Sequence, residues 1–372
     1  MHARSLQIVN TLNVFKYPSE LISFLRDKIS RPVIDVFSIF HKEVWLLAAD
    51  DAQDQDKNRV LFVGRTEERH FISKLFFGGN CTHQSLGHHW LWRTLFYNEK
   101  IGEGCSFSVI QTRWQISRFF RLKSMFCVPA WVFGSVSLTS AFDLHIKKNR
   151  CVKKKLREIK KGNFTIEISS DPLLFDEFYH KMHEPYMKKR YGKCAINENY
   201  DRIKARFQQG SEILFVKSGS QRIAGMIICY KSGDALAYRL GVRDGDFKWV
   251  EKGAISALYF HALKYCRSIG YKKLKLGGSR PFFSDGVLNY KLKSWNMKID
   301  DYSKQFYFIF KPLKTSNFNR NFLSQHQFIS LQKDKMIINT FCKGGKEKTI
   351  VKETKERYFK KGLTEVAAHY LG

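Results

Sequence analysis

The sequence predicts a mixed α/β fold, and three observations carry this prediction. The 372 residues are 44% hydrophobic and 15% aromatic, which is enough apolar material for packed cores. Helix and strand signals alternate through the first 140 residues. Further along, three β-rich runs are separated by glycine-bearing turns, which is typical of an antiparallel meander. With only 24 glycines and 7 prolines, a collagenous or low-complexity chain is excluded.

The first part of the chain contains short elements of both kinds. The patterns predict helices over 19–28 and 90–98, and strands over 44–48, 59–63 and 106–110. This alternation indicates an amino-terminal α/β unit, which we expect to span residues 1–143.

An uncharged run over 124–142 approaches the roughly 20 residues that a membrane-spanning helix needs. Pro129 and Gly134 would interrupt such a helix, and apolar residues alternate with small ones after Trp131. The run is therefore expected to form a pair of buried strands, and no integral membrane span is predicted.

The second part of the chain is more strongly patterned. Asp171, followed by Pro172, is placed to cap a helix, and Gly270 is placed to end another. Helices are predicted over 147–161, 171–191, 200–208, 253–269 and 287–292. Strands are predicted over 164–168, 213–217, 222–230, 235–242, 272–276, 298–299, 305–310 and 336–341, with a last helix near the carboxyl end.

The charge is strongly basic, because 64 Lys and Arg face 34 Asp and Glu, a formal net charge of +30. A positive field attracts phosphate-bearing partners such as nucleic acid, nucleotide cofactors or anionic lipid, although a merely basic surface is an equal alternative. The one dense run, 147–161, holds nine basic residues and one acid. It is a solvated helix face or a phosphate-binding surface.

The eight cysteines include no Cys-x-x-Cys pair, and no signal sequence follows Met1, so we expect a cytoplasmic protein, with peripheral membrane contact left open. Cys81, His83, His88 and His89 match no zinc-binding spacing, so no metal site is expected.

Three stretches resemble one superfamily: 252–258 (KGAISAL), 270–278 (GYKKLKLGG) and 288–295 (LNYKLKSW). With the predicted order of elements, residues 145–312 resemble the GNAT superfamily, in the branch of Fem-type aminoacyltransferases and cellulose-biosynthesis-like acetyltransferases. The resemblance implies a GNAT-like mixed central sheet with flanking helices over 144–312. It also suggests that the chain holds two tandem GNAT-like units, the first being a degenerate copy over 1–143. Residues 313–372 would then be a basic carboxy-terminal extension.

The resemblance implies acyl transfer and points to Lys291, and the needs of that chemistry suggest the other site residues. Asp285 is the expected general base, although Asp-Gly is also a turn pair, and Tyr290 is the expected proton donor unless it is a core residue. Lys291 is expected to bind phosphate, with a solvated lysine as the alternative. The remaining expected substrate-binding residues are Tyr186, Arg190, Tyr191, Tyr238, Gly278 and Arg280.

The donor is expected to be acyl-CoA, held at Gly241, Val242, Lys252, Gly253 and Ala254. Ordinary GNAT enzymes cradle the pyrophosphate with Gln/Arg-x-x-Gly-x-Gly/Ala at a helix start. Here only the central glycine, Gly253, survives, because Val250 and Ile255 flank it. Aminoacyl-tRNA is the alternative donor, and it fits the positive charge.

The sequence therefore predicts a transferase that moves an acyl group to an amine or hydroxyl of an anionic cell-envelope or polysaccharide precursor. The alternatives are a Fem-type aminoacyl-tRNA-dependent enzyme and a non-catalytic RNA-binding protein with the same fold.

Overall fold

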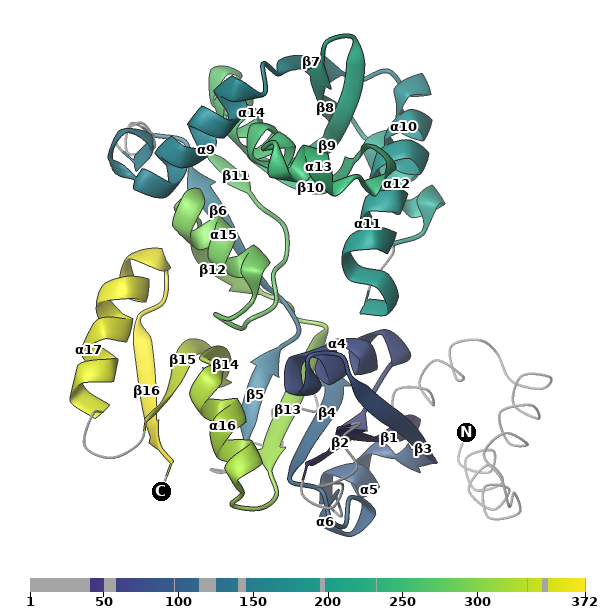
Figure 1. Cartoon of the computed structure of the whole chain (residues 1–372), viewed down its shortest axis with the longest axis vertical. Helices are drawn as coiled ribbons and strands as arrows, with labels where there is room; N and C mark the ends of the chain where they lie inside the picture. The colour runs from purple at the N-terminus through teal and green to yellow at the C-terminus, as the bar shows by residue number, and fades with distance from the viewer. Residues whose placement is uncertain are drawn as a thin grey trace, which may run out of the picture. The chain divides into compact units, whose positions relative to one another are not determined.

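The computed structural model describes residues 41–49, 58–96, 98–113, 125–139, 145–194, 198–231, 233–332, 334–342 and 347–371 (Figure 1). The chain divides into two compact units. Unit 1 combines Met1–Cys127 with Gln305–Arg320, and unit 2 combines Val128–Lys304 with Asn321–Gly372. The helix expected over 19–28 lies outside the described residues.

Unit 1 is built on a six-stranded mixed sheet in the order β3-β1-β2-β4-β13-β5. β2 is antiparallel to β1 and parallel to β4, and β13 is antiparallel to β4. The helix between β2 and β3 ends at Gly78, whose φ of +69° is the left-handed conformation that glycine adopts readily. The elements are β1 (His41–Ala49), β2 (Arg59–Val63), α4 (Thr66–Phe77), β3 (Cys81–Trp90), α5 (Leu91–Phe96), α6 (Asn98–Ile101), β4 (Phe107–Arg113), β5 (Phe126–Pro129) and β13 (Phe306–Pro312).

Unit 2 is built on a seven-stranded mixed sheet in the order β12-β6-β11-β10-β9-β8-β7. The expected antiparallel meander is confirmed as β8, β9 and β10, and β11 is parallel to β10. The strands are β6 (Val132–Ser137), β7 (Thr165–Ser169), β8 (Glu212–Ser218), β9 (Gln221–Lys231), β10 (Asp234–Val242), β11 (Lys273–Lys275) and β12 (Lys298–Tyr302). The α-helices are α9 (Arg150–Lys161), α10 (Leu173–Phe178), α11 (Glu184–Tyr191), α12 (Tyr200–Phe207), α13 (Phe247–Glu251), α14 (Ala254–Ser268) and α15 (Gly286–Ser294).

Helices cover both faces of this sheet, and strand alternation assigns side chains to each face (Figure 1). Leu214 and Val216 of β8 belong to the core that α14 shares, whereas Ile213 and Phe215 belong to the core with α10 and α12. All four side chains are fully buried. The expected mixed α/β class, with a mixed central sheet and flanking helices, is thus confirmed.

The stretch predicted as one helix over 171–191 is interrupted by a π-helical turn, η3 (Tyr179–His183). The backbone N–H of Glu184 donates to the Tyr179 carbonyl, five residues back. Pro185 follows and has no N–H to continue the α-helical ladder, which accounts for a break at this point. The expected cap is present, because an Asp171 carboxylate oxygen accepts from the Leu173 N–H at 2.9 Å.

A small module follows residue 320 in unit 2. Its three-stranded sheet has the order β14-β15-β16, and β14, β16 and α16 were not predicted. Its backbone holds the segment before α15, because Phe283 N–H donates to Gln327 O at 2.9 Å and Ile329 N–H donates to Pro281 O at 2.8 Å. The elements are α16 (Asn317–Gln325), which begins in unit 1, β14 (Phe328–Gln332), β15 (Lys335–Cys342), α17 (Glu347–Tyr358) and β16 (Glu365–Tyr370).

The compact units do not follow the expected ranges 1–143, 144–312 and 313–372. β6 precedes residue 143 but lies between β11 and β12 in the sheet of unit 2. β13 ends at residue 312, within the expected second range, but pairs with β4 in unit 1. The two strands expected within 124–142 are present as β5 and β6, although they belong to different sheets.

The two sheets share an order of pairing. In each, three antiparallel strands (β3-β1-β2 and β8-β9-β10) are followed by one parallel neighbour, β4 or β11. A helix lies in the connection to that neighbour, α4 in unit 1 and α14 in unit 2. The chain order differs, because β3 lies between α4 and β4 in unit 1. The expectation of two related units stays a prediction.

Candidate functional site

In unit 2 the strands β10 and β11 separate, and the expected site residues lie around this divergence. β10 pairs with β9 from Asp234 to Val242 but with β11 only at Ala235 and Leu236. Gly277, just after β11, has a φ of +66°, which turns the chain away. The second half of β10 therefore has no strand partner on this side among the described residues.

Lys291 of α15 holds the diverging end of β11. Its Nζ donates to the carbonyls of Gly277 and Gly278, at 3.2 and 2.9 Å, and to Ser279 Oγ at 3.1 Å. The side chain is only 3% exposed, and burial lowers its pKa to about 7. All three N–H donors of the ammonium are used inside the protein. The geometry thus departs from the expected phosphate ligand, and it makes Lys291 a positioning residue.

Tyr186 and Tyr191 of α11 and Tyr259 of α14 lie near Arg190, and Tyr290 of α15 packs on Tyr259 with ring centres 5.7 Å apart. We call these four tyrosines and Arg190 the Tyr–Arg cluster. The guanidinium carbon of Arg190 lies 5.5 Å from the ring centres of both Tyr186 and Tyr191. Arg190 also donates to the Tyr186 hydroxyl. Burial raises the pKa of all four phenols, to about 12 for Tyr290, so each stays a neutral hydrogen-bonding group at pH 7.

Arg190 is half-buried and forms no ion pair with a carboxylate in the described part of the chain. A desolvated guanidinium without a carboxylate is costly unless a ligand completes it. The expected grouping of Tyr186, Arg190 and Tyr191 is therefore present, and its charge fits an anionic substrate group or a developing oxyanion.

Asp285 caps α15. One of its carboxylate oxygens accepts from the Leu288 N–H at 2.8 Å, so the turn interpretation of Asp285 holds. The carboxylate is half-buried and raises the pKa of Tyr191, which places it near the cluster with a second oxygen for other work. Tyr290, also half-buried, has its hydroxyl 3.1 Å from Ser256 Oγ, as a core tyrosine would.

The loop expected to hold the coenzyme A pyrophosphate is closed. The Lys252 and Gly253 N–H groups donate to Lys248 O and Val250 O within the preceding turn, each at 3.0 Å. Gly253 is buried against α9, where a Cβ on it would lie 3.3 Å from Glu158 Cβ. Ala254 is fully buried. Glu158 lies beside the start of α14, and a carboxylate there disfavours a phosphate.

Gly241 and Val242 are also covered. Gly241 packs on the π-helical turn, where a Cβ on it would lie 2.4 Å from both His183 N and Met182 C. Burial lowers the pKa of His183 to about 4, so the ring is neutral at pH 7 and its Nδ1 lies 2.9 Å from Leu240 O. Gly241 therefore packs on the π-helical turn and Val242 is fully buried, so neither forms an open wall for a cofactor.

Replacing Gly241 with alanine is expected to destabilise unit 2 by about 2–4 kcal/mol, because the Cβ would meet backbone that cannot move independently. Chemical denaturation followed by circular dichroism measures the change. Gly286→Ala is the matched control, since its Cβ would meet nothing within 4 Å. Equal stability of the two variants would contradict the close packing of Gly241.

Three further expected substrate residues have protein partners. The Tyr238 ring lies between two guanidiniums, with Arg206 and Arg239 each 4.3 Å from its centre, and its hydroxyl donates to Glu198. Arg280 is 7% exposed, donates to Ala130 O at 3.1 Å and lies 4.0 Å above the Trp131 ring.

Gly278 contributes its carbonyl to Lys291, and a Cβ on it would lie 3.2 Å from the Trp131 ring. Of these three residues, Tyr238 on β10 and Gly278 after β11 lie where the two strands diverge.

The sequence did not single out Tyr259 or Ser256. Both lie on α14, whose apolar spacing is also that of an ordinary core helix. Tyr259 is 5% exposed and stacks on Trp295 with ring centres 6.1 Å apart. The available signal for both residues was a hydroxyl group at a position where the helical pattern predicts a buried side chain.

Within the described ranges, no three or more His, Cys, Asp or Glu side chains are grouped to hold a metal ion. The same residues include no helix long and apolar enough to cross a membrane.

No family model and no curated protein matches the chain. Among solved structures, L-PGS from Bacillus licheniformis is 11% identical over 80% of this chain and 92% of its own, with a TM-score of 0.33. FemX is 11% identical over 70% and 83%, with a TM-score of 0.37. A GCN5-related N-acetyltransferase from Kribbella flavida is 10% identical over 73% and 55%, with a TM-score of 0.29. With TM-scores below 0.5, these likenesses do not bear on the activity of this chain.

Proposed function

We propose that unit 2 is an acyl-group transferase that moves an aminoacyl group from a polyanionic carrier to an amine or hydroxyl of an anionic acceptor, such as an envelope precursor. The observation that carries the proposal is Arg190, a half-buried guanidinium ringed by neutral phenols and without a described carboxylate. Together with the separated strands and the resemblance of 252–295, it supports a site for a reacting carbonyl.

The chemistry asks little covalent work of the protein. The acceptor nitrogen or oxygen attacks the ester carbonyl, the new C–N or C–O bond forms, and the ester C–O bond to the carrier breaks. In the proposal, Arg190 stabilises the oxyanion, and the free carboxylate oxygen of Asp285 takes the acceptor's proton. Tyr191 or Tyr290 returns a proton to the carrier's hydroxyl.

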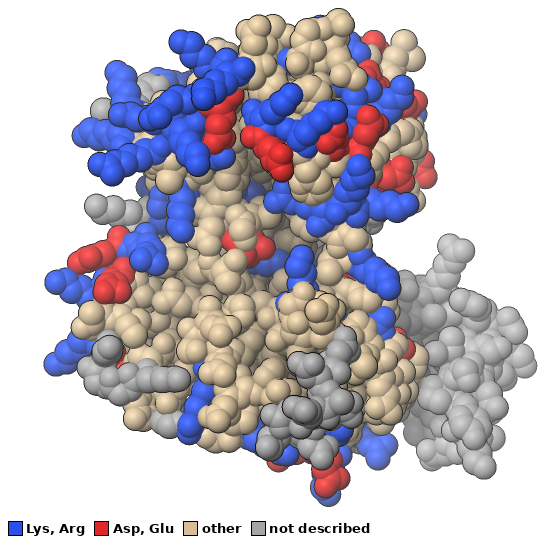
Figure 2. Space-filling view, viewed as in Figure 1, with Lys and Arg blue, Asp and Glu red and all other residues tan. Residues whose placement is uncertain are grey.

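The closed loop at Gly253 disfavours acyl-CoA, which the sequence led us to expect, and the surface of α9 favours a larger anion. The exposed face of α9 carries Arg150, Lys153, Lys154, Arg157, Lys160 and Lys161. Figure 2 shows Lys and Arg side chains gathered over this helix. Among the described residues, the one ion pair on this helix joins Lys155 to Glu158, at 2.8 Å. A tRNA backbone fits such a surface, so aminoacyl-tRNA is the donor we propose.

The experiment is thermal stabilisation of the whole chain by acetyl-CoA, a longer acyl-CoA, bulk tRNA and aminoacylated tRNA, each at low and moderate salt. A ligand bound by the folded state raises the melting temperature. We expect the largest rise in melting temperature with aminoacylated tRNA. With hydroxylamine as the acceptor, we also expect the protein to accelerate aminoacyl-hydroxamate formation relative to the reaction without protein. A salt-resistant shift with acyl-CoA would instead support the acyl-CoA enzyme. An equal shift with charged and uncharged tRNA, without hydroxamate, would indicate an RNA-binding protein.

Reversing three charges on α9 should weaken tRNA binding by a factor of about 100 or more, because each lost phosphate contact removes counterion release. The variant is Lys153→Glu, Lys154→Glu and Arg157→Glu, all at exposed positions. The control reverses three exposed lysines on α17, namely Lys348, Lys352 and Lys355. Filter binding at several salt concentrations measures both. If the two triple variants bind alike, only net charge matters and α9 is not the surface.

A further inference from the structure

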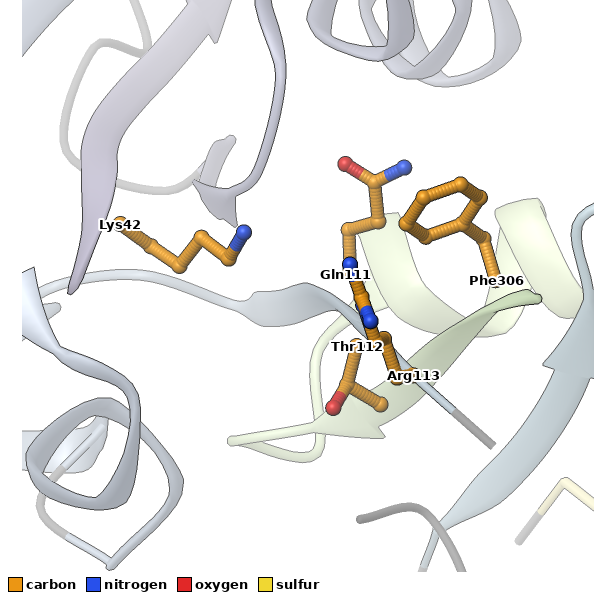
Figure 3. Close-up of a pocket in the computed structure, with 5 residues that line it drawn as sticks. All are labelled: Lys42, Gln111, Thr112, Arg113 and Phe306. Atoms are coloured by element: carbon orange, nitrogen blue, oxygen red, sulfur yellow. The ribbon is translucent and has the colours of Figure 1, made fainter. Parts of the chain in front are cut away.

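Unit 1 contains a pocket at the end of its sheet that the proposed transfer does not use. It is a small, open hollow lined by Lys42, Gln111, Thr112, Arg113 and Phe306 (Figure 3). Lys42 comes from β1, the next three from the end of β4, and Phe306 from the start of β13. Figure 3 shows the Lys42 amino group directed toward the β4 residues, with the Phe306 ring beside the Gln111 amide.

The pocket lies at the carboxyl ends of two parallel strands, β2 and β4, where α/β sheets commonly bind ligands. β2 leads through Gly64 and Arg65 into α4. This turn is held in place, because Arg65 N–H donates to Gln111 Oε1 at 2.9 Å and Gly64 N–H donates to Glu43 O at 3.2 Å. The Arg65 guanidinium lies 4.5 Å from the Phe306 ring centre, which brings a third cation to the pocket.

The three cations Lys42, Arg65 and Arg113 face one another without a counter-ion. None of them forms an ion pair with a carboxylate of the described residues. Burial and the two neighbouring arginines lower the pKa of Lys42 to about 8. Lys42 is half-buried, whereas Arg65 and Arg113 are exposed. An anion bound among the three would relieve their mutual repulsion.

We propose that this pocket binds a phosphate group carried by a small molecule. Three cations match a dianionic tetrahedral group better than a carboxylate, and the arginines can each present two N–H groups to its oxygens. Phe306 offers an apolar wall to the part of the molecule that carries the phosphate. The site lies wholly in unit 1 and does not depend on the transferase proposed for unit 2.

The test is isothermal titration of the full chain with inorganic phosphate, sn-glycerol 3-phosphate and 5′-AMP at matched ionic strength, with acetate as the carboxylate probe. We expect saturable binding of one phosphate compound per chain, and the tightest of the three identifies a free phosphate, a lipid headgroup or a nucleotide as the source. Lys42→Gln with Arg113→Gln should weaken binding by a factor of about 100, at about tenfold per charge-assisted contact.

Lys74→Gln with Arg93→Gln is the matched control, since both side chains are exposed and the same two charges are lost elsewhere in unit 1. Its affinity should equal that of the unaltered chain. The proposal is overturned if none of the phosphate compounds saturates, if acetate binds as tightly, or if the control pair weakens binding as much as the pocket pair. Circular dichroism of the Lys42 and Arg113 variant shows whether it folds, and Lys42→Arg, which keeps the charge, should retain binding.

Discussion

Lys291→Met should destabilise unit 2 by about 3 kcal/mol near pH 8 and lower the rate of transfer by about two orders of magnitude. The substitution leaves the carbonyls of Gly277 and Gly278 and the Ser279 hydroxyl without their donor. It also releases the strand end that borders the site, and a displacement of about 1 Å there is enough to cost on the order of 100-fold in rate. Urea denaturation and hydroxamate formation measure the two effects.

The pH dependence of the free energy of unfolding distinguishes the buried amino group of Lys291 from a side chain that only fills space. The pKa of Lys291 is about 7 in the folded chain and near 10.5 when the side chain is exposed. Between these values the unfolded chain binds a proton that the folded chain does not, so the free energy of unfolding rises as pH increases from about 7 to about 10. Lys291→Met should lack this rise. Below pH 7 both states are protonated, and the contribution no longer changes.

Lys293→Met is the control, since Lys293 lies on the same helix and is exposed. It should keep both the stability and the pH-dependent rise. If the unaltered chain, Lys291→Met and Lys293→Met all show the same change of stability with pH, Lys291 titrates as an exposed lysine. That result would contradict the buried position of its ammonium group.

Local patterns were sufficient for most elements of the fold. The range predicted from sequence for β2 equals the observed one, and the meander was recognised because its turns hold glycine and its strands hold β-branched residues. The assignment of strands to sheets could not be predicted in this way. β6 and β13 are as apolar as any buried strand, and which sheet takes them depends on pairing over more than a hundred residues of chain.

The candidate site was likewise predicted only where local spacing along the chain determines it. Tyr186, Arg190 and Tyr191 share one helix, so their spacing alone places them together. The resemblance pointed to Lys291, but its three internal acceptors come from a loop whose path depends on β11 diverging from β10. The covering of Gly253 by α9 is likewise a tertiary contact, so the sequence could not show that the loop is closed.

Arg190→Gln should lower kcat/KM for aminoacyl transfer to hydroxylamine by about 100-fold or more, while the free energy of unfolding changes by less than about 2 kcal/mol. Glutamine keeps a hydrogen-bond donor near the Tyr186 hydroxyl but removes the charge that opposes a developing oxyanion. Hydroxylamine carries no anionic group, so a loss with this acceptor reports on the reacting carbonyl and not on acceptor binding. Arg190→Lys should recover little, because a single ammonium cannot span the two tyrosine rings as the guanidinium does.

Lys188→Gln is the matched control, as it removes one charge from an exposed position two residues away on α11. If Arg190→Gln and Lys188→Gln transfer at the same rate, Arg190 has no part in the reaction. The Tyr–Arg cluster would then be a structural element of α11, and the proposed function would lose the observation that carries it. A fall confined to KM would instead assign Arg190 to donor binding, since hydroxylamine offers it no charge. A fall in kcat is the result that places the guanidinium on the carbonyl oxygen, where its lack of a carboxylate partner has a chemical reason.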